Sequence, residues 1–190
     1  MALPDPAAHG ATHVTIAPIV VSELAPDLRT VWARKLTRLI PPRATVLELG
    51  CGNGVPVAWI LSDRFAYSGV DASPDQIREA VHAVPSASFV CADPHEVTMR
   101  SGAFDAVISF FSLADVDLDR WPALLDSIRE CLGPDGVLVG AVPMADPETD
   151  VTVEDLLDDA GFEILESTAV AHHDSRAELV RACWFIARRR

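Results

Sequence analysis

Three glycines at alternate positions are the residues of this sequence best suited to hold a ligand. Gly50, Gly52 and Gly54 follow the apolar run Val46-Leu47-Glu48-Leu49, and Pro56 stands where a helix could begin. Glycine lets a backbone turn tightly and approach a ligand closely, and the free N–H groups at a helix start attract negative groups. The segment therefore predicts a strand, a glycine turn and a helix around a nucleotide. Its G-x-G-x-G spacing lacks the third glycine of the dinucleotide fingerprint G-x-G-x-x-G.

A second short strand that ends in an acid supports this interpretation. Ser68-Gly69-Val70-Asp71 comes about 20 residues after the first glycine, the usual interval to a ribose-binding acid. A carboxylate at this place can accept hydrogen bonds from both hydroxyls of a ribose. The alternative is that Asp71 only caps the following helix. We favour the ribose.

The composition predicts one acidic globular domain. The chain has 190 residues, of which 49% are hydrophobic, enough for a sizeable core. A formal net charge of −13 repels phosphate backbones and argues against a nucleic-acid substrate. No apolar run has the length of a membrane span, and no signal peptide is apparent. We therefore expect a cytoplasmic protein with neither a membrane nor a nucleic-acid partner.

Cysteines and histidines form no metal-binding pattern. The four cysteines have no C-x-x-C spacing, and reduced cysteines suit the cytoplasm. Cys51 lies in the glycine turn, where a small residue beside a ligand is the preferred interpretation and a reactive thiol the alternative. His172-His173-Asp174 has metal-type side chains, but adjacent residues in one loop rarely face the same ion, so we favour a solvated turn. No metal site is expected.

The elements that must position these residues alternate in type. Apolar residues at three- and four-residue spacing after Asp27 predict an amphipathic helix, which Pro41-Pro42 ends. Short apolar strands then alternate with helical segments, which predicts a mostly parallel sheet covered on both faces. The last two strands have no helix between them, so the final strand should be antiparallel. The predicted strands are Thr45–Gly50, Ala66–Asp71, Ala87–Ala92, Phe104–Phe110, Val137–Val142, Phe162–Thr168 and Leu179–Ala187.

Five ordered segments of the chain resemble the motifs of the class I S-adenosylmethionine-dependent methyltransferases. They are VLELGCGNG from Val46, GVDASPDQI from Gly69, SFVCAD from Ser88, FDAVISFFSL from Phe104 and LGPDGVLVG from Leu132. The resemblance covers most of the chain and implies an α/β fold, a Rossmann-like class I methyltransferase sandwich. Its seven-stranded sheet would be mostly parallel with an antiparallel last strand. Residues 1–190 would form one domain, with an N-terminal arm at 1–21, a lid helix at 22–40 and a cofactor-binding core at 44–190.

The same resemblance implies that S-adenosyl-L-methionine is the cofactor and assigns residues to its parts. The three glycines would contact the amino-acid tail and the ribose, and Asp93 would lie near the adenine amino group. Trp32 or Lys35 could close the site, although core packing is the preferred role of Trp32. The expected cofactor-binding residues are Glu48, Gly50, Gly52, Gly54, Asp71, Ala72, Ala92, Asp93, Pro94, Ser109, Phe110 and Trp32.

Methyl transfer to a small-molecule acceptor is the activity that the resemblance implies. Candidate general bases are His9 and His13 on the arm, Asp115 after the fourth strand and His172-His173; the catalytic residue itself stays open. Related sequences often have a histidine near position 115, and they usually carry an insertion after the fifth strand that this chain lacks. A non-methylating reaction, such as a cyclisation or rearrangement, and a non-catalytic partner are therefore the alternatives. Without that insertion the acceptor side of the site would be open to solvent. The arm, or a second subunit in a homodimer, would then cover it.

Overall fold

The computed structural model describes residues 27–144, 152–173 and 179–190. The predicted arm, with His9 and His13, and the first residues of the predicted lid helix lie outside the described residues. The strands are β1 (Thr45–Leu49), β2 (Ala66–Asp71), β3 (Ser88–Cys91), β4 (Phe104–Phe110), β5 (Leu132–Pro143), β6 (Phe162–His173) and β7 (Leu179–Arg189). The helices are α1 (Leu28–Leu39), α2 (Val57–Leu61), α3 (Pro74–Ala83), α4 (Trp121–Cys131) and α5 (Val153–Asp159).

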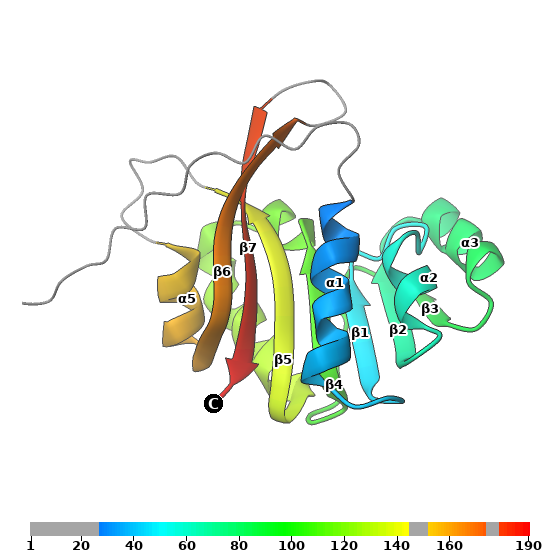
Figure 1. The fold of residues 1–190 in the computed structure, drawn as a ribbon, viewed down its shortest axis with the longest axis horizontal. Helices are drawn as coiled ribbons and strands as arrows, with labels where there is room; N and C mark the ends of the chain where they lie inside the picture. Colours follow the sequence, from blue (N-terminus) through cyan, green and yellow to red (C-terminus); the bar gives the residue numbers. More distant parts are fainter. Residues whose placement is uncertain (1–26, 145–151, 174–178) are drawn as a thin grey trace, which may run out of the picture.

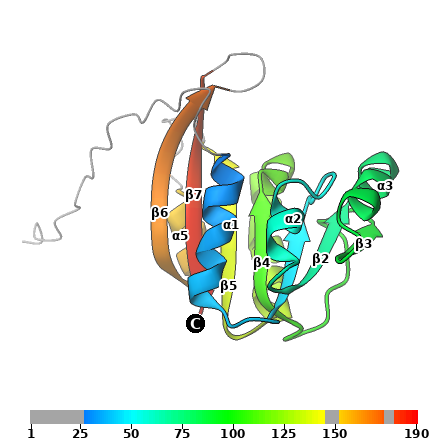
Figure 2. The ribbon, with the colours of Figure 1, turned by 45° about the vertical axis from the view of Figure 1, so that its right-hand side comes forward.

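The strands form one sheet in the order β3-β2-β1-β4-β5-β7-β6 (Figures 1 and 2). The first five strands are mutually parallel where they pair, and β7 runs antiparallel to both of its neighbours, β5 and β6. This confirms the predicted α/β sheet with an antiparallel last strand. Because β1 pairs with β2 on one side and β4 on the other, the strand order reverses beside β1, where α/β sheets bind ligands.

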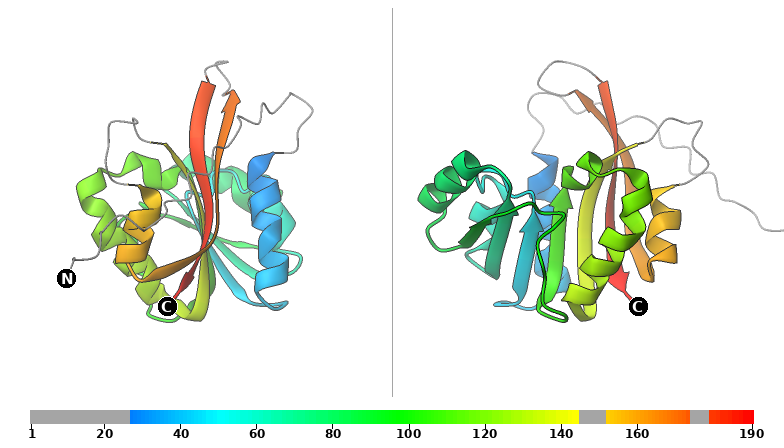
Figure 3. Two further views of the ribbon diagram at one scale, coloured as in Figure 1. Left: turned by 60° about the vertical axis from the view of Figure 1, so that its left-hand side comes forward. Right: turned by 180° about the vertical axis from the view of Figure 1, so that it is seen from behind.

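Helices cover both faces of the sheet (Figure 3). On one face α1 and α2 pack on a cluster that includes Trp32, Leu61 and Trp184, and Val84 at the end of α3 belongs to the same cluster. On the other face α4 and α5 pack on a cluster that includes Leu125, Ile128 and Phe185. Burial on both faces explains why the central strands read as continuous apolar runs in the sequence.

Short polar residues begin the helices that lead into and out of the site. Asp27 caps α1 by accepting a hydrogen bond from the backbone N–H of Arg29 at 2.8 Å. Ser73 caps α3 in the same way, with Pro74 in the first turn. The Ser73 cap directly follows Asp71, so the end of β2 and the start of α3 are fixed together.

The hairpin of β6 and β7 is longer than the sequence predicts. β6 continues to His173 and β7 to Arg189, with His172 paired to Val180. The interpretation of His172-His173 as a turn is therefore wrong, because both residues end a strand. The two strands stay paired with each other beyond the last residue of β7 that pairs with β5. Backbone pairing of this kind needs no apolar pattern in the sequence.

Gly140 provides a direct test of how tightly β5 and β7 are packed. It lies opposite Phe185 in the strand register, and a Cβ at position 140 would lie 2.2 Å from Cζ of that buried ring. We expect Gly140→Ala to lower the free energy of unfolding by about 1–3 kcal/mol, measured by urea denaturation. Phe185→Leu removes the clashing atoms, so the double variant should be more stable than the sum of the two single effects predicts. Strictly additive effects would contradict this packing.

Candidate functional site

Two cavities lie at the carboxyl ends of β1, β2 and β4 and share Gly50 and Phe110. The larger has a volume of about 670 Å³. Its lining residues are Gly50, Asp71, Ala72, Asp93, Pro94, His95, Phe110, Phe111 and Ser112. The smaller has a volume of about 290 Å³. Its lining residues are Arg29, Glu48, Gly50, Cys51, Gly52, Asn53, Val55, Val57, Gln76 and Phe110. The fold thus brings together eight of the residues that the sequence assigns to the cofactor.

The glycine turn is held against the end of β2. The backbone N–H groups of Gly50 and Cys51 both donate to the Val70 carbonyl, at 2.8 and 3.0 Å. Gly50 has φ of 77°, and a Cβ there would lie 2.5 Å from Cβ of Ser112. Only glycine combines this left-handed conformation with so close an approach. The turn therefore needs glycine at position 50 both for its backbone and for contact with the loop after β4.

Asp71 links the turn to the start of α3. Its Oδ2 accepts a hydrogen bond from the Gly52 N–H at 2.9 Å, and its Oδ1 accepts one from the Ser73 N–H at 2.9 Å. A carboxylate has about four acceptor sites, so lone pairs remain for a ligand in the larger cavity, which Asp71 lines. Asp71 therefore organises the turn and presents acceptors to the cavity at the same time.

Asp93 and His95 form the far wall of the larger cavity. The Asp93 carboxylate accepts a hydrogen bond from the His95 backbone N–H at 2.8 Å and lies 3.3 Å from His95 Nδ1. The other ring nitrogen, Nε2, lies 2.7 Å from the Ser112 carbonyl oxygen. His95 therefore bridges the loops after β3 and β4 and fixes their separation. His95 is not among the residues predicted from the sequence, where its single signal is its place two residues after Asp93.

The loop after β4 is fastened by two serines. Ser109 has no exposed surface, and its hydroxyl lies 2.8 Å from that of Ser112, which donates to the Leu49 carbonyl at 2.8 Å. Ser109 lines neither cavity, so the structure places it behind the wall that Ser112 forms. Phe111 follows in a left-handed conformation, with φ of 68°, and its ring makes an edge contact with Trp184. For a bulky residue this conformation is costly, and such strain concentrates at functional sites.

Three other predicted residues lie outside both cavities. A Cβ at Gly54 would meet Phe89 at 3.3 Å and Ala80 at 3.4 Å, so this glycine allows the turn to pack on α3 and β3. Trp32 is buried and stacks on Trp184 with 5.9 Å between the ring centroids, which is the core role that we preferred. Ala92 lines neither cavity.

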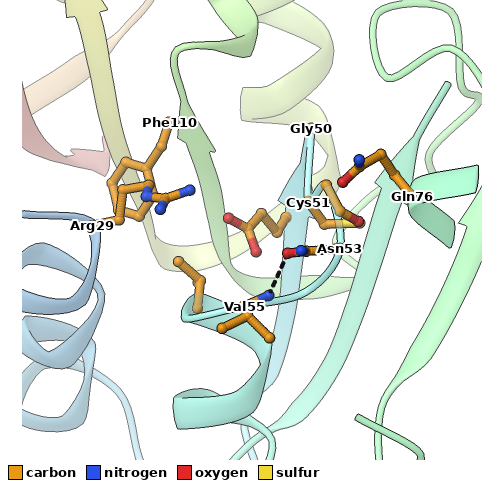
Figure 4. Close-up of a pocket in the computed structure, with 10 residues that line it drawn as sticks. Arg29, Gly50, Cys51, Asn53, Val55, Gln76 and Phe110 are labelled. Atoms are coloured by element: carbon orange, nitrogen blue, oxygen red, sulfur yellow. Dashed lines mark hydrogen bonds between the residues drawn. The ribbon is translucent and has the colours of Figure 1, made fainter. Parts of the chain in front are cut away.

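The smaller cavity holds side chains of opposite charge. Figure 4 shows Arg29 and Phe110 on one side and the glycine turn with Asn53 and Gln76 on the other. The Arg29 guanidinium pairs with Asp27, with 2.7 Å between Nη2 and Oδ2. Glu48 is only 3% exposed, and the Tyr67 hydroxyl donates to its Oε2. Arg29 and Tyr67 are not among the residues predicted from the sequence, because a helix brings Arg29 to the cavity and a neighbouring strand brings Tyr67 to Glu48.

Burial controls the protonation of Glu48 and Cys51, which line this cavity. It raises the pKa of Glu48 to about 7, although the Tyr67 hydrogen bond and the Arg29 charge act in the opposite direction. Burial, with the nearby charges of Glu48 and Asp71, also raises the pKa of the Cys51 thiol to about 12. Cys51 is therefore a neutral thiol at physiological pH, and a small apolar lining residue describes it better than a nucleophile.

The candidate bases and a metal site are not established by the described residues. Asp115 ends the 3-10 turn Ser112–Asp115 after β4, and His13 lies outside the described residues. Both stay predictions. Within residues 27–144, 152–173 and 179–190, no three side chains of histidine, cysteine, aspartate or glutamate gather as metal ligands.

Comparison with known proteins identifies the family. A model of the methyltransferase domain matches residues 24–184. An uncharacterized methyltransferase of Synechocystis is 26% identical over 98 residues, which are 52% of this chain and 46% of that protein. The 2-methyl-6-phytyl-1,4-hydroquinone methyltransferase of the same organism is 34% identical over 74 residues, which are 37% of this chain and 23% of that protein. The matched part of the chain thus spans less than half the length of these curated relatives.

Solved structures share the fold at low identity. The 1,6-didemethyltoxoflavin N1-methyltransferase of Burkholderia thailandensis, with bound S-adenosylhomocysteine, has a TM-score of 0.69, 22% identity and coverage of 85% of this chain and 76% of its own. The cyclase SpnF has a TM-score of 0.68, 20% identity and coverage of 85% and 79%. A methyltransferase of Methanosarcina mazei has a TM-score of 0.68, 18% identity and coverage of 82% and 96%. Since the domain model matches most of the chain, the protein belongs to the class I S-adenosylmethionine-dependent methyltransferase family.

Proposed function

We propose that this protein transfers the methyl group of S-adenosylmethionine to a small-molecule acceptor. The observation that carries the proposal is the pair of neighbouring cavities, in which the polar groups occur in the order that the cofactor requires. Asp71 and Asp93 line the larger cavity, and Glu48 and Arg29 line the smaller. Gly50 and Phe110 lie where the two cavities meet.

The chemistry of these side chains fits the cofactor. A ribose needs acceptors for its hydroxyls, and Asp71 offers carboxylate lone pairs beside the glycine turn. An adenine amino group needs an acceptor, which Asp93 supplies. The amino-acid tail carries an ammonium and a carboxylate, and Glu48 and Arg29 have the complementary charges. Asp71, Asp93, Glu48 and Arg29 would therefore hold the cofactor.

The protein supplies orientation and shielding. When bound, the cofactor provides a methyl group on a positively charged sulfur, which is already reactive toward a nucleophile. Phe110 and Phe111 at the end of β4 place apolar surface in the wall of the larger cavity and would limit the access of water. His95 and Ser112 hold the loops after β3 and β4 at a fixed separation, so the walls are formed before a ligand enters.

A small acceptor agrees with the surface charge. The net charge of −13 disfavours polyanionic substrates, so we infer an acceptor smaller than a nucleic acid. Among the described helices, none is both long and apolar enough for a membrane crossing. The cytoplasmic location, the homodimer and the closing role of the arm stay predictions. A non-methylating reaction is the second candidate, because the cyclase SpnF shares this fold over 85% of the chain.

A labelled-methyl assay tests the proposal. The protein would be incubated with S-adenosylmethionine carrying an isotopic label in the methyl group and a panel of small phenols, amines and carbon acids. We expect label in one acceptor class and an equal amount of S-adenosylhomocysteine. Titration of the protein with cofactor in the absence of any acceptor, followed by calorimetry, is the control for cofactor binding. Binding without transfer to any acceptor would favour the non-methylating alternative, and no binding at millimolar cofactor would overturn the proposal.

A further inference from the structure

The hydroxyl of Tyr67 is a polar group that core packing does not require. Tyr67 lies on β2 opposite Val46, is 3% exposed and has its ring in the core beside Phe89, with 6.1 Å between the centroids. A phenylalanine would fill the same space. The hydroxyl instead reaches along the face of the sheet and donates to Oε2 of Glu48, two residues along β1 from Val46. The contact therefore joins a core residue to the smaller cavity.

Glu48 has little else to hold it. Among the described residues, the Tyr67 hydroxyl is the hydrogen-bond partner of its carboxyl group, and no cation lies within ion-pair distance. Its other oxygen is left for the cavity that Glu48 lines. A buried carboxylate without a cation is costly, so a positively charged group in the cavity would stabilise the ionised form of Glu48.

Three neighbouring groups influence the charge of this carboxyl group. Tyr67 on β2 and Arg29 on α1 favour the ionised form, whereas Asp71 at the end of β2 opposes it. Cys51 in the turn is uncharged at neutral pH, since its pKa is about 12. Arg29 is itself engaged by Asp27 through two guanidinium nitrogens. Among these groups, the Tyr67 hydroxyl is the direct contact that stabilises ionised Glu48.

We propose that Tyr67 is a positioning residue for cofactor recognition. Its hydroxyl favours the ionised form of Glu48 and holds the carboxylate at the cavity, where it receives the ammonium group of the cofactor's amino-acid tail. The proposal rests on the proposed function and extends it to a residue that touches no ligand. It assigns the recognition of the tail to a tyrosine on β2 acting through an acid on β1.

The test compares two ligands that differ in the tail. S-adenosylhomocysteine carries the ammonium, and 5′-methylthioadenosine has the same nucleoside without it. We expect Tyr67→Phe to weaken binding of S-adenosylhomocysteine roughly tenfold at pH 7, by the loss of a hydrogen bond to a charged group. Binding of methylthioadenosine should stay within about twofold, since hydrogen bonds elsewhere are unchanged. In the variant, the rise of S-adenosylhomocysteine affinity with pH should move to higher pH, because Glu48 loses a group that favours its ionised form.

Phe89→Leu is the matched control, because it disturbs the ring contact of Tyr67 but leaves the hydroxyl in place. It should change the affinity for both ligands by the same factor. If Tyr67→Phe lowers the affinity for both ligands equally, or for neither, while the wild type binds both, the positioning role is overturned. A wild type that binds neither ligand would overturn the proposed function itself. Thermal unfolding of each variant checks that the fold is retained.

Discussion

Replacing Asp71 with alanine is expected to lower the affinity for S-adenosylhomocysteine about a hundredfold, or about 2.7 kcal/mol. The carboxylate accepts hydrogen bonds from Gly52 and Ser73, each at 2.9 Å. The variant therefore loses the acceptors that a ribose needs and also the contact that holds the glycine turn. Hydrogen bonds to a charged acceptor are about twice as strong as those between neutral groups. Calorimetry at a single pH is sufficient to measure the change.

Two further variants separate these contributions. Asp71→Asn keeps the size of the side chain and one acceptor oxygen but loses the charge, so its affinity should lie between those of the wild type and Asp71→Ala. Ser73→Ala removes the cap hydroxyl of α3 and keeps the backbone N–H that Asp71 binds. It should leave binding nearly unchanged. Wild-type affinity in Asp71→Ala would show that the ribose lies elsewhere.

The sequence predicts the sheet and the centre of the site because both depend on local signals. The glycine spacing reflects backbone conformation, and Gly50 and Gly52 have positive φ in the structure. Asp71 ends a strand whose apolar residues are evident in the sequence, and the carboxyl ends of parallel strands meet at one edge. The order of strands and helices then predicts the sheet, apart from the longer hairpin of β6 and β7.

Contacts between distant segments could not be predicted in this way. Arg29 and His95 reach the cavities through the packing of α1 on the sheet and the closure of two loops. Tyr67 reaches Glu48 through the register of β2 against β1. Conversely, Ser109 lies in a matching motif, but it lines neither cavity and its buried hydroxyl contacts that of Ser112 instead. Side-chain direction along a strand alternates, so a motif alone does not show which of its residues meets a ligand.

Glu48→Gln is expected to have opposite effects on stability and on binding. The pKa of Glu48 in the folded protein is about 7, above the ordinary value of 4.5 for a glutamate. The native state therefore holds this proton more tightly than the unfolded state does. Stability from this group is fully present below pH 4.5, falls as the pH rises toward 7 and stays low above that. The loss amounts to about 3 kcal/mol for a buried carboxyl group.

Glutamine escapes this loss because it stays neutral at every pH, and its amide oxygen can still accept the Tyr67 hydrogen bond. The variant should equal the wild type in free energy of unfolding near pH 4.5 and exceed it by about 3 kcal/mol at pH 8. It should also bind S-adenosylhomocysteine more weakly at pH 8, since the ammonium group loses its carboxylate. Urea denaturation across this range measures the first effect and calorimetry the second. Glu79→Gln, which removes an exposed charge on α3, is the control and should show neither effect. A difference in free energy of unfolding between variant and wild type that does not change with pH would contradict this prediction. It would show that ionising Glu48 costs the folded protein little stability.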